Sequence, residues 1–235
     1  AGKFVDVTGP YGWDFAAVPA GRLETSANQK NGNVRYGVHI VQPIVETRIS
    51  FSLDIWELDN IVRGAKDIDF QPLDKAVKES ALFEEVAIYN GLKKAGIKGL
   101  TESVQYPEIT FGNSIKTVLE AVSKGITTLL NASVEGPYVL VVSPELWRSL
   151  AELVEGYPIS KHIEKLLGSE VIYSPAIDSA YLISTRGGDL ELTLGGDFSI
   201  GYESHATEKV NLFIAESFTF RILDPSVYVK FKTTK

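Results

Sequence analysis

Alternating apolar and polar positions are the clearest pattern in the first quarter of the chain. In residues 45–55, apolar side chains and Thr47 occupy every second position, with polar side chains between them. This period of two predicts a strand with one apolar face. Residues 34–40 alternate in the same way, and Asn31-Gly32 is a strong hairpin signal because both residues tolerate positive φ. The segment 21–58 contains no helical pattern and is therefore predicted to be a β-arm.

The apolar face of this arm has no helix within the segment to cover it. A projecting apolar stripe needs another surface to bury it, and we expect that surface to belong to a neighbouring subunit. The candidate intersubunit contacts are Val45, Ile49, Phe51, Leu53 and Ile55.

Two long helices are predicted after the arm. Residues 72–95 carry apolar side chains broadly around a helical surface and end before Gly96, which predicts a spine helix packed on more than one side. Residues 115–130 form a cleaner apolar stripe, with Asn113 or Ser114 as the N-cap and Gly125 inside the helix.

The second half of the chain mixes strands and helices. An apolar strand at 138–142 precedes helices at 144–155 and 159–167 and strands at 171–173 and 181–184, which predicts a compact α/β subdomain. Strands at 190–194, 198–202, 210–223 and 227–231 close the chain. The fold class is α+β, in one interwoven unit with two lobes and an arm.

Composition narrows the range of functions. Thirty acidic against 23 basic residues give a formal charge of −7, so nucleic acid is disfavoured as a partner. The absence of cysteine excludes disulfides, thiolate metal sites and a cysteine nucleophile. No apolar run approaches the ~18 residues of a membrane span, so we expect a cytoplasmic protein with no membrane partner. Methionine is also absent, so the start has been processed or the chain is part of a longer product, and we favour the second interpretation.

Catalytic chemistry finds little support in the sequence. Phosphate-loop, dinucleotide and nucleophile-elbow motifs are missing, and none of the three histidines follows a glutamate by three residues as a helical di-iron site requires. The acidic clusters 54–59 and 67–69 permit a carboxylate pair or a cation site, but charges pairing with Arg63 or Lys66 are the favoured interpretation. Glu84-Glu85 is interpreted as a solvated or subunit-facing edge. The tryptophans are interpreted as core or interface anchors. We predict no catalytic residues, no metal site and no cofactor in this chain.

Five segments together resemble the encapsulin family, the self-assembling shell proteins of bacterial and archaeal nanocompartments. They are FVDVTGPYGWDF at 4–15, LDIWELDNIVRG at 53–64, EGPYVLVV at 135–142, RGGDLELTLGGDFSIGYE at 186–203 and FIAESFTF at 213–220. No one of these segments is diagnostic alone, but their order and spacing cover nearly the whole chain.

The resemblance implies a tailed-bacteriophage major-capsid-like fold with a peripheral domain, an axial domain and an extended β-loop. The extended loop would be residues 19–58 and the axial domain 136–185. The peripheral domain would combine 1–18, 59–135 with the spine helix, and the closing strands 186–235. Family shells usually carry an N-terminal helix ahead of the first strand, and this chain starts after that point. An archaeal member carries a ferritin-like domain fused ahead of its shell domain.

The function implied is that of a structural shell protein, not an enzyme. It would assemble with itself into an icosahedral nanocompartment, a multiple of sixty subunits, around a ferritin-like cargo protein or fused domain that stores iron and protects against oxidation. Iron would then be held by the cargo. The resemblance also places a pore loop at 168–179, including Ser174, Pro175, Ile177 and Asp178. A viral major capsid protein and a carboxylate-based hydrolase or peptidase are the alternatives.

Overall fold

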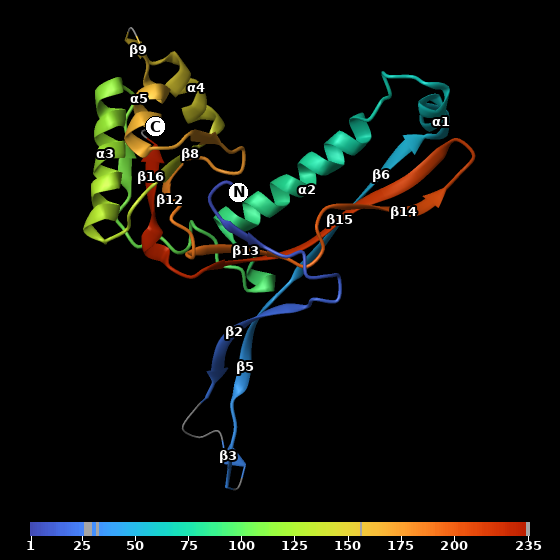
Figure 1. Cartoon of the computed structure of the whole chain (residues 1–235), viewed down its shortest axis with the longest axis horizontal. Coiled ribbons are helices and arrows are strands. Elements are labelled where there is room, and N and C mark those ends of the chain that lie inside the picture. Colours follow the sequence, from blue (N-terminus) through green and yellow to red (C-terminus); the bar gives the residue numbers. More distant parts are fainter. Residues whose placement is uncertain (26–29, 32, 156, 234–235) are drawn as a thin grey trace.

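The computed structural model describes residues 1–25, 30–31, 33–155 and 157–233 of the chain. Its elements form an elongated lobe, a compact α/β lobe, and an arm that projects away from both (Figure 1). The two lobes and the arm expected from the sequence pattern are therefore present. Within this part of the chain, no helix is long and apolar enough to cross a lipid bilayer.

The elongated lobe is built on one long strand, β15 (Lys209–Ile222). Its C-terminal part pairs with β13 (Leu190–Leu194), which also pairs in parallel with β1 (Asp6–Thr8). The rest of β15 lies between β14 (Ser199–His205) and β6 (Val45–Asp54), both antiparallel to it. The pairing of β6 with β15 continues over ten residues, so the alternation seen in the sequence belongs to a strand inside this sheet.

The spine helix α2 (Gln71–Asn90) lies along β6 and β15 (Figure 1). Phe51 and Leu53 are 7% and 6% exposed and form a hydrophobic cluster with Ala76 of the helix and Ile214 of β15. Burial of a large apolar side chain contributes about 1.5–3 kcal/mol. The expectation that this stripe has no cover within its own chain is therefore wrong, because α2 folds back across it.

The two ends of the predicted stripe have different surroundings. Val45 is partly buried against the main core, whereas Ile55 is the first residue of helix α1 (Ile55–Arg63). The strand ends there because the Asp54 side chain accepts a 2.8 Å hydrogen bond from the backbone N–H of Trp56 and caps the helix. The sequence predicted that Ile55 belongs to the strand. This is wrong, because Ile55 is the first residue of α1.

The arm that projects is a hairpin of β2 (Ala17–Glu24) and β5 (Val38–Pro43). Farther out, β3 (Lys30–Asn31) pairs with β4 (Val34–Arg35). Gly32, half of the predicted Asn31-Gly32 turn, lies outside the described residues. The predicted extended loop, 19–58, is wider than this hairpin because β6 belongs to the sheet of the elongated lobe.

The α/β lobe contains a five-stranded sheet in the order β11-β8-β12-β16-β7. Its strands are β7 (Ile109–Phe111), β8 (Tyr138–Val142), β11 (Val171–Tyr173), β12 (Ala180–Ser184) and β16 (Tyr228–Thr233). Its helices are α3 (Ile115–Asn131), α4 (Pro144–Glu152) and α5 (Ile159–Leu167), with a short hairpin of β9 (Val154–Glu155) and β10 (Tyr157–Pro158) between the last two. Every residue of β8 and β12 is buried. The lobe includes the predicted axial domain, 136–185, and also takes in α3, β7 and β16.

The boundaries of the two long helices follow local chemistry. Ser114 caps α3 in a reciprocal arrangement with Thr117, so one of the two predicted caps is confirmed. A Cβ on Gly125 would lie 2.9 Å from Leu182 Cδ2, so glycine lets the helix sit close to the sheet. The spine helix ends at Asn90 rather than at residue 95, because Gly91 takes a φ of +77° and a separate 3₁₀ turn follows.

Candidate functional site: the arm, the spine and the joint between the lobes

The arm presents a row of exposed apolar side chains. Four side chains of the row are between 43% and 63% exposed: Val34, Tyr36, Val38 and Ile40. An apolar row of this kind on a projecting element marks an interaction surface. The uncovered stripe is therefore in residues 34–40. Its alternation was visible in the sequence, but the sequence analysis expected the uncovered stripe at 45–55, where α2 covers Phe51 and Leu53.

Two hydrogen bonds attach the root of the arm to the body, and a third closes the hairpin at its base. Gln42 Nε2 donates to the carbonyl of Ala95 at 2.8 Å, and Arg221 Nη1 donates to the carbonyl of Pro19 at 3.3 Å. The backbone N–H of residue 44 donates to the carbonyl of residue 16 at 2.9 Å. Each strand of the hairpin is thus attached where it leaves the body, which sets the direction of the arm.

The predicted pore loop lies against the C-terminal half of α2. Ser174 is 1% exposed, and its hydroxyl donates a 2.9 Å hydrogen bond to Glu85 Oε2. Ile177 is partly buried against the main core, whereas Pro175 and Asp178 are exposed. Ser174 does not line an opening because its own spine helix covers it, so that part of the pore prediction is wrong. A pore at Pro175 and Asp178 stays a prediction.

A pair of carboxyl groups joins the spine helix to the sheet. Glu216 of β15 is 1% exposed and its carboxyl faces that of Glu84 on α2 closely enough to share a hydrogen bond. A hydrogen bond between two carboxyl groups requires one of them to carry a proton. Burial raises the pKa of Glu216 to about 9, with the Glu84 charge and that of Asp197 acting in the same direction. Burial also raises the pKa of Glu84.

This acid pair was not predicted from the sequence. Glu84 and Glu85 were interpreted as a solvated or subunit-facing edge, but one contacts Glu216 and the other accepts from Ser174. The available signal was Glu216 itself, the single charged residue in the largely apolar strand segment 213–220. A charged residue in a buried strand needs a partner, and the partner was on the helix above it.

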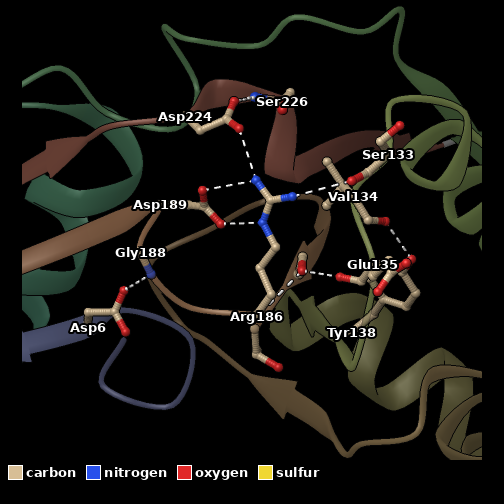
Figure 2. Close-up of polar contacts among 12 residues, drawn as sticks. Asp6, Ser133, Val134, Glu135, Tyr138, Arg186, Gly188, Asp189, Asp224 and Ser226 are labelled. Atoms are coloured by element: carbon tan, nitrogen blue, oxygen red, sulfur yellow. Dashed lines mark hydrogen bonds and ion pairs between the residues drawn. The ribbon is translucent and has the colours of Figure 1, made fainter.

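The guanidinium group of Arg186 forms hydrogen bonds to the segments that connect the two lobes (Figure 2). Arg186 makes two hydrogen bonds to Asp189, at 2.7 and 3.0 Å, and one to Asp224 at 3.0 Å. Its remaining terminal nitrogen donates to the carbonyl of Ser133 at 3.4 Å. Burial would raise the pKa of Asp224, but hydrogen bonds from Ser226 and the Arg186 charge lower it overall. The connections after α3, β12 and β15 therefore meet at one side chain.

The turn that carries Arg186 requires glycine. Gly187 and Gly188 have φ values of +85° and +83°, and the N–H of Gly188 donates a 2.6 Å hydrogen bond to Asp6 Oδ2 (Figure 2). This glycine pair therefore forms the turn between β12 and β13. Through it, β1 at the start of the chain is attached to the same joint.

Three aspartates of the acidic clusters have structural partners. Asp54 caps α1, Asp59 lies 3.5 Å from Arg63, and Asp69 accepts from the N–H of Gln71 at 2.9 Å. Among the described residues, no three histidine, aspartate or glutamate side chains come together as metal ligands would. The favoured structural interpretation of these clusters therefore agrees with the contacts.

The remaining candidates also lie on the surface. His205 Nδ1 is 2.5 Å from the Tyr202 hydroxyl on the same strand. Trp13, Trp56 and Trp147 are between 43% and 66% exposed, so none is a core residue. Their proposed role as interface anchors stays a prediction.

Together, the spine helix on a long sheet, the α/β lobe and the projecting arm define a protein with the fold of the phage capsid proteins. The capsid of the Myoviridae phage XM1 matches 97% of this chain and 90% of its own, with a TM-score of 0.57 and 10% identity. The virus-like particle from Pyrococcus furiosus matches 98% of this chain and 91% of its own, with a TM-score of 0.70 and 17% identity. At these identities the likeness establishes the fold alone, and it confirms the predicted fold class.

The sequence comparison identifies the family. The Linocin_M18 model, described as encapsulating protein for peroxidase, matches residues 1–219. The type 1 encapsulin shell protein of Rhodococcus erythropolis is 42% identical over 219 residues, which cover 93% of this chain and 83% of that protein. This chain belongs to the encapsulin shell protein family, as the five segments predicted.

Replacing Arg186 tests the joint. Lysine keeps the charge but cannot make the planar, forked contacts to two carboxylates and a carbonyl. We expect Arg186→Lys to lower the free energy of unfolding by about 1–2 kcal/mol, between the values typical of exposed ion pairs and of charge-assisted hydrogen bonds. Thermal unfolding measures this change. Arg63→Lys, in an exposed pair, is the control, and equal losses in the two variants would contradict the joint.

The acid pair predicts how stability depends on pH. The native protein holds a proton on Glu216 from the ordinary pKa of 4.5 up to about 9, whereas the unfolded chain has released it. The native state then binds more protons, so the free energy of unfolding falls as pH rises through this range, by roughly 1.4 kcal/mol per pH unit at most. Glu216→Gln should flatten the pH dependence of the melting temperature. Glu79→Gln, on the exposed face of α2, should keep the wild-type slope, and an unchanged slope in Glu216→Gln would disprove the assignment.

Proposed function

We propose that this chain assembles into a closed icosahedral shell, a multiple of sixty copies, that encloses an iron-handling, ferritin-like cargo. The observation that carries the assembly is the arm, because its apolar row at 34–40 is exposed on a hairpin rooted in a rigid body. If the arm of one copy binds a different surface on the next copy, the contact is head to tail. Repeated contacts of this kind form a closed ring when the rotation between successive copies permits closure. Membership of a shell protein family supports closure.

The cargo is proposed on different grounds. The described residues of this chain bring together no cluster of metal ligands, so the iron chemistry is assigned to a partner inside the shell. The resemblance to shells that carry a ferritin-like cargo supports this choice, and the chain itself would act as a container rather than an enzyme. The family description, encapsulating protein for peroxidase, favours a peroxidase as the second candidate.

Charge on the arm should prevent assembly. The double variant Val38→Asp/Ile40→Asp places two carboxylates on the apolar row, and burying them against another subunit without partners costs several kcal/mol. We expect intact, folded subunits that no longer form closed particles, as measured by size-exclusion chromatography and electron microscopy.

The matched control is Leu130→Asp, which adds a carboxylate at a side chain that is 53% exposed on α3, away from the arm. We expect this variant to keep its particles. Wild-type yields of particles from the arm variant would show that residues 34–40 are not an assembly surface.

Iron oxidation should require the cargo. Shells of this chain alone should oxidise ferrous iron no faster than buffer, because the described residues of the chain bring together no group of three metal-ligating side chains. Shells loaded with a ferritin-like protein should oxidise it and keep the mineral. Absorbance of ferric product and electron-dense cores measure the two effects. Saturable oxidation by empty shells would overturn the proposal, and loading of a peroxidase but not of a ferritin-like protein would favour the second candidate.

A further inference from the structure

A basic pocket lies at the root of the arm. It has a volume of about 610 Å³ and is bounded by β2, β5, the end of β15 and the loop after α2. Arg22, Lys98 and Arg221 line it together with Gln42 and Ser103, and the described residues that line it include no carboxylate. A pocket lined by cations is unexpected in a chain whose formal charge is −7.

Two of the three cations are unpaired. Arg221 is held by Glu191 at 2.9 and 3.1 Å, although its Nε is buried with no hydrogen-bond partner. Arg22 and Lys98 are exposed and make no hydrogen bond or ion pair with any other described residue. The pocket thus presents two free positive charges, one on the arm and one on the body, and both face an open volume.

The opposite end of the spine helix is strongly acidic. Residues 54–74 contain six acidic and two basic side chains, and the segment 64–70 that leads into α2 is mostly exposed. Asp67 has no partner among the described residues, and Asp69 accepts from a single backbone N–H. A helix of 20 residues is about 30 Å long, so α2 separates the acidic segment from the basic pocket.

We propose that the acidic segment 64–70 of one copy docks into the basic pocket of the next copy. Opposite charges at the two ends of one rigid element cannot meet within a subunit, but they match between copies placed head to tail. Asp67 and Asp69 would then contact Arg22 and Lys98, joining the arm to the body and fixing the angle of the arm. This inference rests on the proposed assembly and adds a second, electrostatic contact to the apolar row.

Cross-linking tests the contact directly, because the chain has no cysteine of its own. Lys66→Cys in the acidic segment and Ser103→Cys in the pocket keep all four proposed charges. In particles of the double variant, a short bismaleimide should produce a ladder of dimers, trimers and larger species on a denaturing gel. The two sites lie beyond opposite ends of α2, so a link within one chain is out of reach.

The control pair is Lys66→Cys with Lys165→Cys, which places the second thiol on an exposed position of α5 and should give no ladder. Closed particles of the test pair with no ladder would overturn this inference and leave the assembly proposal intact. Absence of particles from the wild-type chain would overturn the assembly proposal itself.

Charge reversal supplies an independent readout. Arg22→Glu with Lys98→Glu, and Asp67→Lys with Asp69→Lys, should each lower the fraction of subunits in particles several-fold at low salt, and the combined variant, in which both charge pairs are exchanged, should recover it. High salt should weaken the wild-type contact by screening. If the combined variant forms fewer particles than either parent variant, these charges do not meet.

Discussion

The ten-residue pairing of β6 with β15, covered by α2, is the interaction on which the rest of the molecule depends. Because β15 also pairs with β13 and β14, one strand connects the joint between the lobes to the far end of the spine. Hydrogen bonds from Gln42 and Arg221 hold the base of the arm where it leaves the sheet. The position of the sheet therefore sets the direction of the arm. A shell subunit needs such rigidity, since small angular errors accumulate around a closed surface.

Two polar contacts complete this framework. The Glu84 and Glu216 carboxyls hold the helix to the strand with a shared proton, and Arg186 gathers the segments that pass between the lobes. Both contacts place polar groups between elements that could slide against each other if apolar packing alone held them. Directional hydrogen bonds define a single arrangement, which a repeating assembly requires of every copy.

Much of the fold followed from the sequence because its signals are local. The alternation in 45–55, the cap at Ser114 and the glycine turn at 187–188 depend on neighbouring residues, and the structure contains each of them. The cover over Phe51 could not be found in this way, because it depends on where a later helix returns in space. Three other features also depend on residues that are far apart in the sequence and could not be predicted for the same reason. They are the partner of Glu216, the burial of Ser174 and the basic pocket. Resemblance supplied the domain plan but not these contacts.

The arm is a two-stranded hairpin that stands away from any core, and such a hairpin is marginally stable in water on its own. In the proposed assembly its strands would gain full order on docking, so the first contacts between subunits would carry an entropic cost that later contacts share. Growth of such a shell would be governed by nucleation. Subunits below a threshold concentration would stay dispersed, assembly above it would start slowly and finish quickly, and closed shells would persist after dilution to concentrations at which they would not have formed.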